Sequence, residues 1–106
     1  MRRENRLKQR LAAGERLAGL WLQSGSPTLA ELAVLAGFEV VLIDNEHGPA
    51  SLETTLELMR AVEAAGGIAI VRVPWNDQVY LKRVLDLGAS SLMIPMIQSG
   101  EEARAA

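Results

Sequence analysis

The residue types that could carry out acid–base chemistry gather directly after one apolar run of this sequence. In the stretch LIDNEHGP, residues 42–49, two carboxylates, Asp44 and Glu46, stand next to the chain's single histidine, His47. A carboxylate that holds one imidazole nitrogen leaves the other nitrogen available as a base at neutral pH. We therefore expect an acid–base site in which Asp44 orients His47.

A cation stands near the end of the next apolar run. Arg72 lies inside IAIVRVP, residues 68–74, where an unpaired guanidinium is costly to bury and must meet a carboxylate, a ligand or water. We expect Arg72 and His47 to flank one pocket, with Trp21 as its wall. Each residue also has a simpler interpretation: a lone histidine as a surface residue, a strand arginine as half of an ion pair, and a tryptophan as part of the core.

Apolar runs of strand length alternate with helical patterns along the chain and would position these residues. The runs span residues 19–23, 39–44, 68–74 and 91–97. Helix signals follow each run: Ser26 with Pro27, Ser51, Asn76 and the capping-box spacing of Ser99 and Glu102 as starts, and Gly37, Gly66-Gly67 and Gly88 as stops. An earlier helical pattern carries Leu7 and Leu11. The order βαβαβαβ predicts an α/β protein.

The near-continuous apolar character of the runs is typical of parallel strands covered by helices. A doubly wound nucleotide-binding sheet is disfavoured, because the turn after the first strand reads LQSGSP and has no G-x-G-x-x-G. A segment of a (β/α)8 barrel is favoured, since 106 residues are too few for a complete barrel of about 250. The chain stops shortly after its last helix start, so we expect residues 1–106 to be a partial barrel domain truncated in the fourth helix. In such a barrel the residues at the strand ends form the active site.

The composition argues against two classes of partner. With 49% hydrophobic residues, 23% charged residues and a net charge of −2, nothing indicates a nucleic-acid or membrane partner. The five basic residues of the N-terminus are expected to solvate a helix face: Arg2, Arg3, Arg6, Lys8 and Arg10. The absence of cysteine fits a reducing compartment, and we expect the cytoplasm.

Five segments in order carry a resemblance to a known family. They are GLWLQSGSP, AGFEVVLIDNEHGP, VRVPWND, LKRVLDLGA and SLMIPMIQSGEEARAA, and they run from about residue 17 to the end. Together they resemble the N-terminal part of the HpcH/HpaI aldolase family, the metal-dependent class II pyruvate aldolases. The resemblance implies the N-terminal portion of a (β/α)8 TIM barrel, about four βα units after an N-terminal helix. It also implies a carbon–carbon lyase that cleaves 4-hydroxy-2-oxo acids to pyruvate, or a similar 2-oxo acid, and an aldehyde.

The resemblance also assigns residues. It makes His47 the acid–base group, Asp44 its orienting carboxylate and Arg72 the group that faces the keto oxygen of the substrate, with Trp21 beside the substrate. Glu46 falls in the motif without an assigned role. The implied cofactor is a divalent metal, Mg²⁺, Mn²⁺ or Co²⁺, whose ligands lie on later strands and not in this chain. A homo-oligomer is implied as well.

Three alternatives stay open at the level of sequence. Schiff-base aldol chemistry needs a desolvated lysine at a strand end, but Lys8 and Lys82 both fall on helical patterns. A CoA-ester lyase of the citrate-lyase type is the enzymatic alternative. The other is a non-catalytic fragment that serves only in assembly or interaction. We expect residues 1–106 alone to be inactive.

Overall fold

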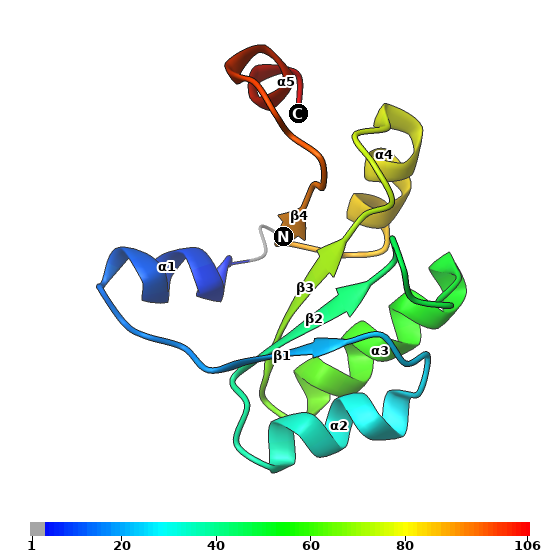
Figure 1. Ribbon diagram of the computed structural model, residues 1–106. Helices are drawn as coiled ribbons and strands as arrows, with labels where there is room; N and C mark the ends of the chain where they lie inside the picture. The colour runs from blue at the N-terminus through cyan, green and yellow to red at the C-terminus, as the bar shows by residue number, and fades with distance from the viewer. Residues whose placement is uncertain (1–3) are drawn as a thin grey trace.

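Four parallel strands form the centre of the molecule (Figure 1). The computed structural model describes residues 4–106. The strands β1 (Gly19–Leu22), β2 (Val40–Asp44), β3 (Ile68–Arg72) and β4 (Leu92–Met93) lie side by side in chain order. Each neighbouring pair is parallel, as predicted from the apolar runs.

Helices precede, connect and follow the strands, and each begins at a capping side chain. The helices are α1 (Arg6–Ala12), α2 (Pro27–Leu35), α3 (Leu52–Ala64), α4 (Gln78–Asp86) and α5 (Gly100–Ala105). The predicted caps Ser26, Ser51 and Ser99 each accept a hydrogen bond from the backbone N–H three residues later. The local sequence therefore fixes where the helices that follow β1, β2 and β4 start.

The two faces of the sheet have different neighbours because side chains alternate along each strand. Val41, Ile43 and Val71 are buried in one core cluster with residues of α2, α3 and α4. That cluster also includes Ala30, Ala33, Leu58, Met59, Val62, Val73 and Val84. Residues of the opposite parity, among them Asp44 and Arg72, project from the other face.

The fourth strand and its neighbouring helix differ from the sequence prediction. The predicted strand over residues 91–97 is ordered as a strand only at Leu92–Met93. Pro95 has no backbone N–H to donate, and Met96 adopts a left-handed backbone with φ of 59°, so the extended pairing cannot continue. The cap of α4 is Asp77 and not the predicted Asn76, because the Asp77 carboxylate accepts from Tyr80 N–H.

Helix α1 lies at the end of the sheet where the strands begin. Asn5 Nδ2 donates to the Ser90 carbonyl over 2.8 Å, and Arg6 Nη2 donates to the Gly66 carbonyl over 3.4 Å. Arg2 and Arg3, expected on the outer face of this helix, fall outside the described residues. Within residues 4–106, no helix has the length and apolar composition needed to cross a bilayer.

Candidate active site

The carboxyl ends of β2 and β3 bring two of the predicted site residues into contact. The β2–β3 register places Asp44 directly opposite Arg72. Arg72 Nε donates to Asp44 Oδ1 over 3.1 Å, and Arg72 Nη2 donates to Asp44 Oδ2 over 2.6 Å. This two-pronged pair fixes the plane of the guanidinium.

Trp21 and Glu46 complete the surroundings of the arginine. The Arg72 guanidinium carbon lies 4.7 Å from the centroid of the Trp21 ring, within the range of a cation–π contact. Glu46 Oε2 lies 2.9 Å from Arg72 Nη1 in an ion pair. Because Asp44 engages only Nε and one N–H of Nη2, the other terminal N–H groups of Arg72 are available for a ligand as well as for Glu46.

Asp44 is the fixed anion at the centre of the site. Its side chain is buried and also accepts hydrogen bonds from Trp21 Nε1 at 3.0 Å and from the backbone N–H groups of Glu46 and His47 at 3.0 and 3.1 Å. Burial opposes ionisation, but hydrogen bonds from Arg72, Trp21 and these amides outweigh it and hold the pKa of Asp44 well below its usual range. Asp44 is therefore a carboxylate at neutral pH.

His47 differs from the expected arrangement. The expectation that Asp44 holds an imidazole nitrogen is not met by the contacts among residues 4–106, because the Asp44 oxygens accept from Arg72, Trp21, Gln23 and two backbone amides. The carboxylate near the ring is Glu46, whose Oε1 lies 3.5 Å from His47 Nε2. The His47 side chain is 65% exposed, so the imidazole is open to a substrate.

Two contributors were not predicted from the sequence. Gln23 Nε2 donates to Asp44 Oδ2 over 3.3 Å, and Glu46, which had no assigned role, contacts both Arg72 and His47. A signal for Gln23 was present, since it stands two residues after Trp21 and strand alternation puts both on one face. Trp21 itself is 49% exposed and belongs to this site and not to the buried core.

The loop after β2 depends on a glycine. A Cβ at Gly48 would overlap the carbonyl oxygen of Asp44 and would lie 3.2 Å from the carbonyl oxygen of Gln23. Only glycine therefore allows the backbone to turn back against the end of its own strand. This close approach accounts for the glycine that directly follows His47.

The described residues do not fit a metal site. Residues 4–106 contain no group of three His, Cys, Asp or Glu side chains placed to hold a metal ion. Glu46 Oε2 is buried without a hydrogen-bond donor in this part of the chain, but the cationic Arg72 Nη1 stands beside it, which disfavours a second cation there. That the metal ligands lie on later strands stays a prediction from the family resemblance.

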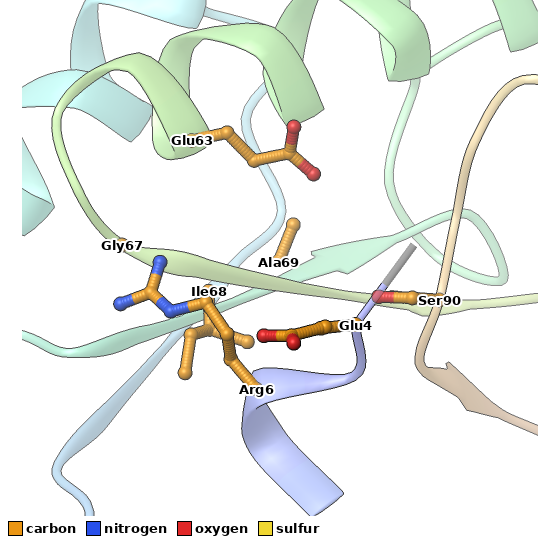
Figure 2. Close-up of a pocket in the computed structure, with 7 residues that line it drawn as sticks. All are labelled: Glu4, Arg6, Glu63, Gly67, Ile68, Ala69 and Ser90. Carbon is orange, nitrogen blue, oxygen red and sulfur yellow. The ribbon is translucent and has the colours of Figure 1, made fainter. Parts of the chain in front are cut away.

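A pocket of about 250 Å³ lies at the opposite end of the sheet (Figure 2). Figure 2 shows Glu4 and Arg6, at the start of α1, on one side of β3 and Glu63 of α3 on the other. Gly67, Ile68, Ala69 and Ser90 also line it. This pocket adjoins the amino ends of β3 and β4, away from Arg72, and is not the candidate active site.

The charged side chains of this site lie at the carboxyl ends of successive parallel strands. Enzymes built on parallel α/β barrels have their active sites at this end of the strands. Residues 17–106 match the HpcH/HpaI aldolase/citrate lyase family, and the chain belongs to that family. The solved structure of an HpcH/HpaI aldolase/citrate lyase family protein from Burkholderia cenocepacia J2315 superposes with a TM-score of 0.90 at 40% identity, covering 96% of this chain and 41% of that one. The α/β fold thus corresponds to the N-terminal part of a TIM barrel.

Two curated relatives show the kinds of enzyme in this family. The 4-hydroxy-2-oxo-heptane-1,7-dioate aldolase of Escherichia coli is 43% identical over 103 residues, which are 97% of this chain and 39% of the relative. The hydroxypyruvate/pyruvate aldolase of Sagittula stellata is also 43% identical over 103 residues, 97% of this chain and 41% of the relative. The chain therefore spans about two fifths of the length of these aldolases.

Proposed function

We propose that the complete protein containing these residues cleaves a 4-hydroxy-2-oxo acid to pyruvate, or a similar 2-oxo acid, and an aldehyde. The observation that carries the proposal is the Arg72 guanidinium, fixed by Asp44 and stacked on Trp21 near the exposed His47. Membership in a family of aldolases and lyases supports it.

Arg72 would act on the keto oxygen of the substrate. When the bond between C3 and C4 breaks, negative charge develops on this oxygen as the enolate forms. Donors that are already oriented stabilise such charge without reorganising during the reaction. The pairing with Asp44 and the contact with Trp21 supply that orientation.

His47 would accept the proton of the 4-hydroxyl group. Loss of this proton drives formation of the aldehyde carbonyl, and in the reverse direction the imidazolium returns the proton. Its exposed ring is accessible, and Glu46 Oε1 at 3.5 Å from Nε2 is placed to orient it. Asp44 holds the His47 backbone through its amide and not the ring.

The remaining features of the proposal come from the family resemblance. A divalent metal, Mg²⁺, Mn²⁺ or Co²⁺, would supply Lewis acidity in the complete protein. Residues 4–106 do not form a site for it. We also propose a cytoplasmic homo-oligomer that acts on small 2-oxo acids and aldehydes, without a nucleic-acid or membrane partner.

Pyruvate release by the complete gene product tests the proposed function. We expect metal-dependent release of pyruvate from 4-hydroxy-2-oxo acids, followed with a coupled lactate dehydrogenase assay. A citryl-type CoA ester serves as the competing substrate. Cleavage of the CoA ester alone would favour the citrate-lyase alternative, and no turnover of either substrate would favour the assembly role.

Substitution Arg72→Lys tests the role of the planar guanidinium. Lysine keeps the charge, but its compact ammonium cannot make both hydrogen bonds to Asp44 and at the same time donate to a keto oxygen. We expect losses of about tenfold, roughly 1.4 kcal/mol, both in cleavage and in exchange of the pyruvate methyl protons followed by NMR. Arg60→Lys, on the exposed face of α3, is the matched control. Unchanged methyl exchange in Arg72→Lys would contradict the enolate-facing role.

A further inference from the structure

The residue between Asp44 and Glu46 faces away from the candidate active site. Asn45 is 7% exposed, and its side chain meets the helices that cover the sheet. Its backbone N–H donates to the Arg72 carbonyl over 2.8 Å and continues the β2–β3 pairing past Asp44. Asn45 is thus the last residue held by the sheet before the chain turns toward His47.

Asn45 joins two helices through its amide group. Asn45 Nδ2 donates to Thr55 Oγ1 and to the Tyr80 hydroxyl, both over 2.9 Å. Thr55, fully buried in α3, in turn donates from Oγ1 to the Ser51 carbonyl over 2.7 Å. Tyr80 belongs to the first turn of α4, where its own N–H is held by Asp77. We call Asn45, Thr55 and Tyr80 the polar clamp.

The polar clamp fixes the orientation of the peptide that leads into the His47 loop. Both N–H bonds of the Asn45 amide are used, so rotation of this side chain would leave buried polar groups unpaired. Rotation of the backbone at Asn45 would also displace the N–H groups of Glu46 and His47, which bind Asp44 Oδ1. The position of His47 relative to Arg72 therefore depends on contacts made in the helix layer.

We propose that Asn45, Thr55 and Tyr80 are positioning residues that set the placement of His47 over the substrate. This inference rests on the proposed aldolase function. The clamp acts through the backbone of the loop and touches no reacting atom. It also links the His47 loop to the start of α4, and so to the loop that follows Arg72.

Substitutions at Thr55 test the clamp with little change of shape. Valine replaces the Thr55 hydroxyl by a methyl group, whereas serine keeps the hydroxyl. In the complete protein we expect Thr55→Val to lower kcat about tenfold with KM changed less than about twofold, and Thr55→Ser to restore most of kcat. Thr54→Val, the same change one residue away and outside the clamp, is the matched control. Tyr80→Phe removes only a hydroxyl and should also lower kcat.

Amide hydrogen exchange supplies a readout that needs no activity. The N–H groups of Glu46 and His47 should exchange about tenfold faster in Thr55→Val and at the wild-type rate in Thr55→Ser and Thr54→Val. Wild-type kcat and exchange in Thr55→Val, or equal losses in the serine and valine variants, would overturn the clamp. If the wild-type protein cleaves no 4-hydroxy-2-oxo acid, the proposed function fails, and exchange alone still decides whether the clamp holds the loop.

Discussion

Replacing His47 by alanine in the complete protein is expected to lower kcat for retro-aldol cleavage by about 10²-fold or more. This is the usual contribution of a positioned acid–base group. The imidazole is exposed at the carboxyl end of the sheet, and its Nε2 lies beside Glu46. Its removal should leave the folded structure intact, because the His47 side chain is 65% exposed and fills no part of the core.

The control and the contradicting result for His47→Ala follow from this exposure. Glu57→Ala, on the exposed face of α3, should retain wild-type turnover and the same thermal unfolding midpoint. Added imidazole should restore part of the activity of His47→Ala, because the vacated site is open to solvent. Near wild-type cleavage by His47→Ala, measured as pyruvate release, would remove the acid–base assignment.

Much of the fold was predictable because its determinants are local. Ser26, Ser51 and Ser99 cap helices where the sequence places them, and glycines such as Gly88 follow the helix ends. The predictions from the sequence are wrong where two adjacent residues can cap the same helix and where strand pairing decides how long a strand is. Asn76 and Asp77 are adjacent cap candidates, and the carboxylate is the one that accepts from Tyr80 N–H.

The site was predictable as a set of residues but not as a set of contacts. Strand ends identify Asp44, His47 and Arg72, but the partner of each depends on the register between β2 and β3. That register sets Asp44 opposite Arg72, and the Asp44 oxygens accept from Arg72, Trp21, Gln23 and two backbone amides instead of from the imidazole. The contacts of Glu46 with Arg72 and His47 follow from the same three-dimensional arrangement, whereas strand alternation already places Gln23 on the face of Trp21.

Packing against the sheet decides which of two neighbouring residues of α4 is buried. Val84 is fully buried, and Leu85 is exposed. Two adjacent helical residues point about 100° apart, so only one of them can face the sheet directly. Helix α4 directs Val84 into the core cluster, which leaves Leu85 on its outer side.

The isolated 106-residue chain is expected to give no detectable aldol turnover at any metal concentration. Within residues 4–106 the described contacts of the site come from β1, β2, β3 and the loop after β2, and the His47 side chain is 65% exposed, so water reaches it. Oriented donors such as Arg72 stabilise an enolate strongly only where water is excluded. The aldolases that it matches are about two and a half times as long, and a barrel of this class closes with eight strands.

The same isolated chain is expected to self-associate. β1 and β4 are the outer strands of the sheet, and each leaves one side unpaired within the described residues. Exposed apolar side chains lie beside these edges, Trp21 on β1 and Met93 on β4. Unpaired edges with apolar neighbours favour association between chains.

Light scattering of purified residues 1–106 should therefore give a mass of at least two chains, and the coupled pyruvate assay with Mg²⁺ or Mn²⁺ should stay at background. A monodisperse monomer that turns over substrate would contradict both expectations, because it would show that four strands alone can exclude enough water from the site.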